Sequence, residues 1–207
     1  MSNSTLFLTM GSGNSFKPAL VVRQLGLSVN RQFLDVLAGE TRQAPFLAIN
    51  PRGMVPYLQF ADGRGLGESN AIAWYLAEGS PLIPACPRQR AESIQWMIFE
   101  QTSLEPNISP ARFFTHICPH LTAEHSHEIP GWLARGHQAL ALLEQHLSAR
   151  EFMTDHGYGI ADIAVFGYTH LAAEGGFDLA AYPAISAWCH RVTRQPGYLP
   201  IAELLAV

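Results

Sequence analysis

The stretch NPRGMVPYLQFADGRGLGESNAIAWYLA, residues 50–77, contains the turn, strand and helix signals that decide the fold of the first part of the chain. Asp62-Gly63 is a strong two-residue turn signal between two extended runs, and it predicts a β-hairpin. Apolar residues at helical spacing follow, so we expect an amphipathic helix over residues 68–79. A hairpin that leads directly into a helix indicates a mixed α/β domain.

Towards the N-terminus, apolar runs alternate with helical patterns. SFKPALVVRQLG, residues 15–26, predicts a helix, and we expect Ser15 to be its N-cap because Pro18 belongs in the first turn of a helix. The other expected elements are two strands and a short helix, at residues 5–10, 29–37 and 44–50. The predicted order is therefore β-α-β-α-β-β-α, an α/β sandwich.

The second half of the chain has a different character. SPLIPACP, residues 80–87, carries three prolines and is typical of a linker. Beyond it the strand signals stop, and long helical patterns occupy residues 88–105, 129–149, 159–175 and 182–197. We therefore expect two domains, an α/β domain over residues 1–80 and an all-α helical bundle over residues 88–207.

Composition and charge narrow the class of protein. The chain has 207 residues, of which 48% are hydrophobic, enough to bury a substantial core. Its net charge of −4 argues against nucleic acid or an anionic membrane as the main partner. No apolar run approaches the ~20 residues that span a bilayer, and the first residues lack the features of a secretion signal. Three scattered cysteines without a C-x-x-C pair fit a reduced, cytoplasmic protein.

Two elements of the quoted stretch suit the binding of a small peptide. Val55 precedes Pro56 at the start of a predicted strand, and a cis Pro56 would turn the backbone edge of Val55 towards a cleft, where an extended peptide can pair with it. Glu68 and Ser69 stand where a strand enters a helix. The N–H groups of a helix N-terminus bind a carboxylate, Ser69 Oγ can add a donor, and Glu68 can meet an ammonium.

Three segments carry a resemblance to a known family. GSGNSFKPALVVRQLG, PFLAINPRGMVPYLQF and GESNAIAWYLA together resemble the thioredoxin-like N-terminal domain of glutathione S-transferases, especially bacterial members with an S-G-N-x-x-K segment. QWMIFEQTSLEP, GIADIAVFGYTH and FDLAAYPAISAWCHRV are similar to the helical domain of the same family. The resemblance covers nearly the whole chain, and it implies a thioredoxin-like domain followed by a helical domain.

The resemblance implies that glutathione is the co-substrate and gives each motif a role. Val55, ahead of a cis Pro56, would pair with the cysteinyl part of glutathione, and Glu68 with Ser69 would hold the γ-glutamyl end. Family members often have lysine or histidine near NPRGM to bind the glycyl carboxylate, but this chain has Gly53 and Met54 there. Arg42 or Arg52 is the candidate substitute.

The resemblance also points to two catalytic candidates. Ser12 stands where serine-type members keep the hydroxyl that contacts the sulfur, and Asn14 coincides with an asparagine of disulfide-reducing relatives. Ser15 occupies the place of a cysteine found in many close relatives. A free thiol has a pKa near ~8.5, and one hydrogen bond of roughly 1.5–3 kcal/mol to the thiolate would lower it by about 1 to 2. We expect Ser12, helped by Asn14, to stabilise the thiolate, which then attacks an electrophile lodged between the domains.

In the helical half, Arg112 and Phe113 are candidates for the wall of the electrophile pocket. Gly159 stands where the family's helix-capping motif has serine or threonine, and Asp162 is present; we interpret this motif as a folding feature. The histidines between residues 116 and 127 resemble a metal cluster, but they lack an H-E-x-x-H pattern, and we expect no metal site.

The leading hypothesis is a cytoplasmic, homodimeric glutathione S-transferase that conjugates glutathione to a hydrophobic electrophile in detoxification. A glutathione-dependent disulfide oxidoreductase acting through Ser12 and Asn14 is an alternative. A non-catalytic glutathione S-transferase-like interaction module is another alternative, since the basic residue expected near Met54 is missing.

Overall fold

The computed structural model describes residues 4–206, and its first unit has a thioredoxin-like fold. In chain order its elements are β1 (Thr5–Leu8), α1 (Gly13–Gln24), β2 (Asn30–Phe33), a 3-10 turn (Glu40–Arg42), α2 (Ala44–Ile49), β3 (Tyr57–Gln59), β4 (Gly65–Leu66) and α3 (Ser69–Ala77). The predicted β-α-β-α-β-β-α order is confirmed.

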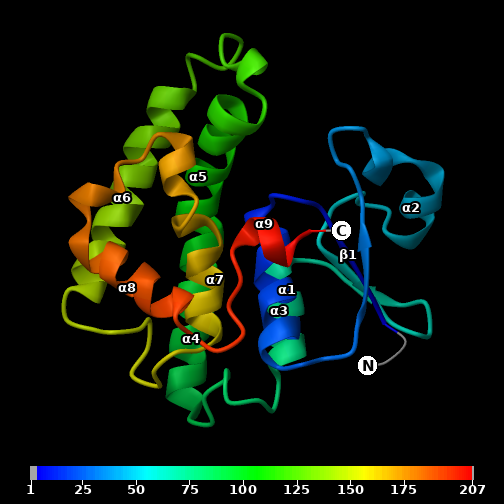
Figure 1. Ribbon diagram of the computed structural model, residues 1–207, viewed down its shortest axis with the longest axis horizontal. Helices are drawn as coiled ribbons and strands as arrows, with labels where there is room; N and C mark the ends of the chain where they lie inside the picture. Colours follow the sequence, from blue (N-terminus) through cyan, green and yellow to red (C-terminus); the bar gives the residue numbers. More distant parts are fainter. Residues whose placement is uncertain (1–3, 207) are drawn as a thin grey trace. The chain divides into compact units, whose positions relative to one another are not determined.

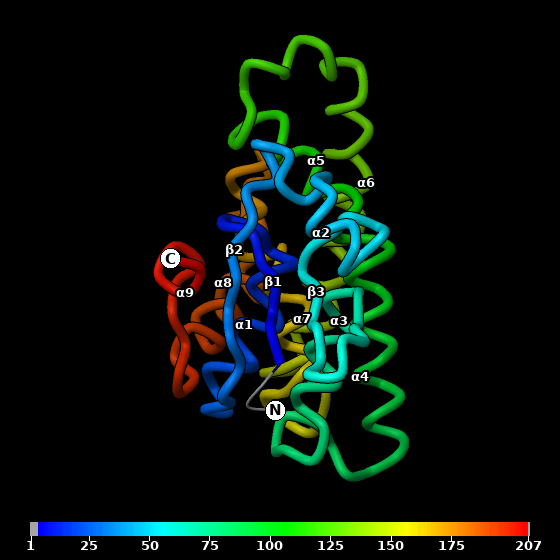
Figure 2. Tube along the Cα trace, turned by 90° about the vertical axis from the view of Figure 1, so that its right-hand side faces the viewer, coloured from blue at the N-terminus to red at the C-terminus, as the bar shows by residue number. Residues whose placement is uncertain are grey.

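The four strands form one mixed sheet in the order β2-β1-β3-β4. Strand β1 is parallel to β2 and antiparallel to β3, with Leu6 opposite Leu58, and β3 is antiparallel to β4. Figure 2 shows β2, β1 and β3 side by side. Helices α1 and α3 pack together on one face of the sheet, and α2 lies on the other (Figure 1). Both faces of β1 are therefore covered, which explains its continuous apolar sequence.

Helix α1 begins earlier than the sequence predicted. Its N-cap is Ser12, whose Oγ accepts a hydrogen bond from the backbone N–H of Ser15 at 3.2 Å, and Pro18 lies inside the helix. The expectation that Ser15 is the N-cap was wrong. Ser15 is fully buried, and its Oγ accepts a hydrogen bond from the N–H of Thr9 at 3.0 Å. Pro18 costs the helix one backbone bond, which the buried helix tolerates because its packing supplies most of its stability.

The second unit, Pro84–Gln195, contains helices and no strand, as the sequence predicted. Its α-helices are α4 (Pro87–Phe99), α5 (Glu105–Arg112), α6 (Ile129–Leu147), α7 (Ile160–Thr169) and α8 (Pro183–Thr193). Two π-helical turns (Glu100–Leu104 and Phe113–Ile117) and three 3-10 turns (Pro119–Leu121, Ala172–Gly175 and Leu179–Ala181) connect them. Across residues 4–206, no helix combines the length and the apolar character that crossing a bilayer requires.

A buried aspartate organises the start of α7. Asp162 is fully buried and accepts hydrogen bonds from the N–H groups of Gly159 and Met153, each at 3.0 Å, and from Trp188 Nε1 at 2.8 Å. Burial raises its pKa from 3.8 to about 6, against the opposing effect of these donors. All three partners of the Asp162 carboxylate belong to the helical unit. This agrees with the interpretation of the motif as a folding feature.

The last segment of the chain belongs to the first unit, which includes the residues from Pro196 onwards. The expected boundary of the second domain, 88–207, is corrected at this end. Helix α9 (Ile201–Leu204) contacts α1, Tyr198 packs edge-on against Phe16, and Arg31 Nη1 donates to the carbonyl of Leu204 at 3.0 Å. These contacts join segments far apart in the sequence, and no local sequence pattern predicts them.

Candidate functional site

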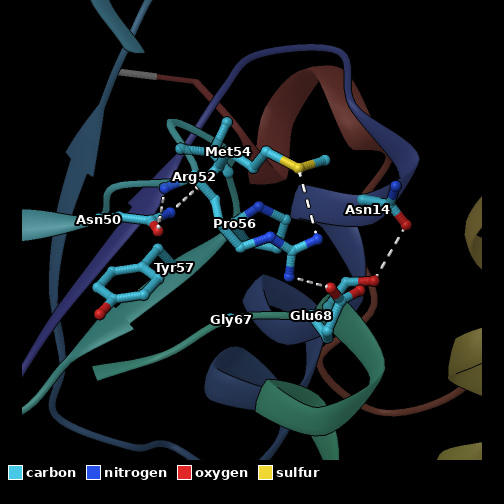
Figure 3. Close-up of a pocket in the computed structure, with 10 residues that line it drawn as sticks. Asn14, Asn50, Arg52, Met54, Pro56, Tyr57, Gly67 and Glu68 are labelled. Atoms are coloured by element: carbon cyan, nitrogen blue, oxygen red, sulfur yellow. Dashed lines mark hydrogen bonds and ion pairs between the residues drawn. The ribbon is translucent and has the colours of Figure 1, made fainter. Parts of the chain in front are cut away.

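A cleft in the first unit gathers most of the predicted site residues. It is lined by Asn14, Asn50, Arg52, Met54, Val55, Pro56, Tyr57, Gly67, Glu68 and Ser69 (Figure 3). These residues come from the first turn of α1, the loop that precedes β3 and the junction of β4 with α3. The fold thus brings three separate sequence segments to one surface.

The loop before β3 presents an unpaired stretch of backbone. The Val55-Pro56 peptide bond is cis. Within the described part of the chain, neither the N–H nor the C=O of Val55 has a hydrogen-bond partner, although Val55 lines the cleft. An open main-chain donor and acceptor of this kind can pair with an extended peptide.

Asn50, which the sequence analysis missed, holds this loop in shape. Its Nδ2 donates to the carbonyl of Met54 at 2.8 Å, and its Oδ1 accepts from the N–H of Arg52 at 3.2 Å. Gly53 has a φ of +59°, and a Cβ there would lie 2.7 Å from the carbonyl oxygen of Thr41. The turn therefore requires glycine at this position, and Met54 is the next side chain to face the cleft.

Glu68 enters α3 in an unusual backbone conformation. Its φ of 65° is the only positive value among the non-glycine residues of the 4–206 range. Such a conformation costs about 1–3 kcal/mol and persists where the surrounding structure imposes it. Glu68 is the N-cap of α3, and Ser69 is the first residue of that helix. The first N–H groups of a helix lack intrahelical acceptors, so this end of the cleft offers donors to an anion.

Two opposite charges face each other in the cleft. Arg52 Nη1 lies 2.5 Å from Glu68 Oε1, and Arg52 Nη2 lies 3.8 Å from the sulfur of Met54 (Figure 3). The side chain of Arg42 instead donates from Nη1 to the carbonyl of Arg52 at 3.1 Å, and Arg42 is outside the set of lining residues. Of the two arginines considered for the glycyl carboxylate, Arg52 is the one in the cleft.

Beneath the cleft, Asn14 and Ser69 meet a buried lysine. Ser69 Oγ donates to Asn14 Oδ1 at 3.0 Å, and Lys17 Nζ donates to the same Oδ1 at 3.0 Å and to Ser69 Oγ at 3.4 Å. Lys17 is fully buried. The hydroxyl proton of Ser69, expected to serve a ligand, is thus directed at Asn14. The sequence analysis gave Lys17 no role, although the lysine of the S-G-N-x-x-K segment and its i, i+3 spacing from Asn14 were the available signals.

Ser12 lies one residue outside α1, and it is not one of the residues that line the cleft. Its oxygen accepts the capping bond from Ser15, and a hydroxyl in this role keeps its own proton for donation. Ser15 Oγ accepts the hydrogen bond from the N–H of Thr9, and Ser15 is also not one of the residues that line the cleft. Asn14 is therefore the better placed of the two catalytic candidates.

The two candidates for the electrophile pocket lie in the helical unit. Arg112 is nearly buried, with Nε 2.6 Å from Glu174 Oε2, an arrangement typical of a structural ion pair. Phe113 packs edge-on against Phe114. Among the residues that the structure describes, no group of three or more histidine, cysteine, aspartate or glutamate side chains is placed to hold a metal ion.

Comparison with known proteins agrees with this architecture. Residues 11–78 match the N-terminal domain of glutathione S-transferases, and residues 130–196 match the C-terminal domain. A crystal structure of a possible glutathione S-transferase from Rhodopseudomonas palustris is 43% identical with a TM-score of 0.92, over 96% of this chain and 89% of that one.

Two more distant relatives are informative. The disulfide-bond oxidoreductase YfcG of Escherichia coli is 27% identical over 89% of this chain and 87% of its own length. The glutathione transferase URE2P6 from Phanerochaete chrysosporium, solved in complex with oxidised glutathione, is 25% identical with a TM-score of 0.82, over 98% of this chain and 94% of that one. With both domains matched and a relative above 40% identity across nearly its full length, the chain belongs to the glutathione S-transferase family.

Proposed function

We propose that this protein is a glutathione transferase that binds glutathione in the cleft of the first unit and conjugates the whole tripeptide, through its sulfur, to a hydrophobic electrophile. The observation that carries the proposal is the presence of two features in one cleft. The unpaired backbone of Val55 lines the same cleft as Glu68 and Ser69, which stand at the N-terminus of α3. An extended peptide with a charged amino-acid end fits both.

Each part of glutathione has a partner in this arrangement. The cysteinyl amide pairs with the N–H and C=O of Val55. The γ-glutamyl carboxylate takes the N–H groups at the start of α3, including that of Ser69, and the γ-glutamyl ammonium meets Glu68. The glycyl carboxylate lies towards Arg52, with Met54 beside it. The complex of the relative URE2P6 with oxidised glutathione supports this choice of ligand.

The chemistry follows from the sulfur that the cleft would hold. A thiol is a poor nucleophile until it loses its proton, and donors aimed at the sulfur favour the thiolate. Asn14 is the donor in the cleft, and the hydroxyl of Ser12 is the second candidate. The bound thiol gives its proton to solvent water, the thiolate electron pair forms a bond to the electrophilic carbon, and the leaving group departs with the electrons of the bond that breaks. The protein supplies position and electrostatic stabilisation, and the nucleophile belongs to the ligand.

Disulfide reduction is the second candidate function. The similarity to the disulfide-bond oxidoreductase YfcG and the position of Asn14 in the cleft favour it. None of the ten described residues that line the cleft is a cysteine, so the sulfur exchange would run between two glutathione molecules and the substrate without a covalent protein intermediate. Incubation with a disulfide and with an aryl halide separates the activities, since reduction releases oxidised glutathione and transfer releases a thioether.

Two further properties form part of the proposal. Ile94 and Ile98 lie one turn apart on α4 and are 44% and 57% exposed, which suits contact with a second copy of the chain. We propose a homodimer, and sedimentation of wild type against Ile98→Glu tests it. The cytoplasm is the proposed location, and detoxification the proposed role.

Calorimetry with glutathione tests the binding step directly. We expect saturable binding in the micromolar to millimolar range and a loss of binding for Glu68→Ala. An interaction module without catalytic function would show no heat of binding at millimolar glutathione, and this result would overturn the proposal.

A further inference from the structure

Lys17 is a fully buried cation at the base of the cleft that the family resemblance leaves without a role. It sits one turn after the start of α1, and its side chain reaches up to Asn14 and across to Ser69, a residue 52 positions later in the sequence. A buried ammonium is costly unless hydrogen bonds satisfy it. Its hydrogen bonds to Asn14 and Ser69 offset part of this cost.

The three side chains form a closed triangle of hydrogen bonds. Asn14 Oδ1 accepts from both Lys17 Nζ and Ser69 Oγ, each at 3.0 Å, while Lys17 Nζ lies 3.4 Å from Ser69 Oγ. An ammonium has three donors and no acceptor. The side of the Asn14 amide that faces Lys17 must therefore be the oxygen, because the opposite flip would set the Nδ2 donor against the ammonium, which has no acceptor.

The orientation of this amide decides what the cleft can offer to a sulfur. With Oδ1 held by Lys17 and Ser69, the Nδ2 group of Asn14 points to the other side, as the amide in Figure 3 shows. A flipped amide would present an oxygen acceptor, which repels a thiolate and favours the thiol. The same residue would thus raise or lower the pKa of a bound thiol according to its flip.

We propose that Lys17 is a positioning residue for glutathione activation: it locks the side-chain amide of Asn14 so that Nδ2 donates to the sulfur of bound glutathione. The inference rests on the proposed function, since it concerns the thiol of that ligand. Lys17 acts through Asn14 and does not touch the sulfur itself.

The test begins with calorimetry on the wild-type protein and continues with the ionisation of bound glutathione. The thiolate is followed by its ultraviolet absorbance as the pH is raised, in wild type, Lys17→Met, Asn14→Ala and the double variant. We expect each single variant to raise the pKa of the bound thiol by about 1, the effect of one hydrogen bond to a charged group. The double variant is expected to raise it no further, because both changes remove the same bond.

Each result has a defined meaning. If wild type does not bind glutathione, the proposed function and this inference both fail. If wild type binds and Lys17→Met leaves the thiol pKa unchanged, or if the two single effects add, only the inference is overturned. Arg23→Met, which removes an exposed cation from the last turn of the same helix, is the matched control and should leave the pKa where it was.

A second measurement on the wild-type protein covers the case in which Lys17→Met does not fold. The side-chain amide protons of Asn14 are assigned by their absence from the NMR spectrum of Asn14→Ala. We expect these resonances to move when glutathione is added and to stay in place with γ-glutamyl-alanyl-glycine, which lacks the sulfur. Equal changes with both tripeptides would show that Nδ2 does not contact the sulfur and would overturn the proposal.

Discussion

Arg52 and Glu68 lie 16 residues apart in the sequence, yet their side chains form an ion pair of 2.5 Å in the cleft that we propose for glutathione. Both side chains are more than half exposed, at 62% and 57%. Such a pair contributes only about 0.2–1 kcal/mol, so a ligand that brings both charges can replace it. We expect bound glutathione to separate the two side chains, with its γ-glutamyl ammonium on Glu68 and its glycyl carboxylate on Arg52.

Replacement of Arg52 should change which peptide the cleft prefers. In Arg52→Gln, the guanidinium that competes with the ligand's ammonium for Glu68 is removed. The same change removes the cation that we propose for the glycyl carboxylate. We expect binding of γ-glutamylcysteine, which lacks the glycine, to strengthen relative to glutathione by about 2- to 5-fold, the equivalent of one exposed ion pair. Calorimetry with both peptides measures the ratio. Arg42→Gln is the matched control, since Arg42 lies outside the residues that line the cleft. An unchanged ratio in Arg52→Gln would contradict this separation of the two side chains by the ligand.

Met54 offers a gain-of-function test. It is 53% exposed, and it lies in the segment where the family resemblance implies a basic side chain. We expect Met54→Lys to strengthen glutathione binding by up to about 5-fold through a new exposed ion pair, and the gain should shrink at high salt. Met54→Leu, which keeps the apolar character, should bind as wild type does. If Met54→Lys binds no better at low salt, the glycyl end of the ligand does not lie beside residue 54.

The backbone of Glu68 links stability to binding. Its φ of 65° suits glycine, so Glu68→Gly should be more stable than Glu68→Ala by about 1 kcal/mol. Both variants lose the carboxylate, and both should lose affinity for glutathione. Urea unfolding measures the first difference and calorimetry the second. Equal stability of the two variants would show that the conformation is not strained, and wild-type affinity in either would remove Glu68 from the site.

The buried Asp162 should make stability depend on pH. Its folded-state pKa, raised by burial from 3.8 to about 6, means that the folded protein binds more protons than the unfolded chain between these values. The free energy of unfolding therefore decreases as the pH rises from about 4 to about 6, by up to about 3 kcal/mol.

In Asp162→Ala three N–H donors lose their acceptor. We expect the free energy of unfolding of this variant to be lower than that of wild type by at least about 2 kcal/mol at pH 4. The difference is largest at pH 4 because the wild-type protein loses stability as the pH rises towards 6. Urea unfolding at several pH values measures both curves. If the stability difference between wild type and Asp162→Ala instead grows from pH 4 to pH 6, the carboxyl of Asp162 is ionised throughout this range and its pKa lies below its usual value.

Much of the cleft was predictable because its signals are local. The Asp62-Gly63 turn predicted the hairpin of β3 and β4, and Gly63 does adopt a φ of +84° there. Val55-Pro56 and Glu68-Ser69 were recognisable at their spacing by family resemblance, and both line the cleft. The start of α1 was predicted wrongly, because Pro18 was assigned to the first turn and the packing that tolerates a proline inside this helix is not visible in the sequence.

The residues that hold the cleft residues in position were harder to predict from the sequence. Asn50 and Lys17 act through hydrogen bonds to Met54, Asn14 and Ser69, and the bond between Lys17 and Ser69 spans 52 residues. A lysine three residues after an asparagine is more often a solvated side chain than a buried one. Only its complete burial in the structure distinguishes it.

By itself the sequence determined the order of elements, the division into an α/β half and a helical half, and the segments that line the cleft, since periodicity, turn residues and short motifs act over a few neighbouring residues. The tertiary structure alone decided which way the Asn14 amide faces, that Arg52 and Glu68 pair, and that the chain end returns to the first unit. Hydrogen-bond direction and burial depend on groups brought together from distant parts of the chain, and only folding sets those distances.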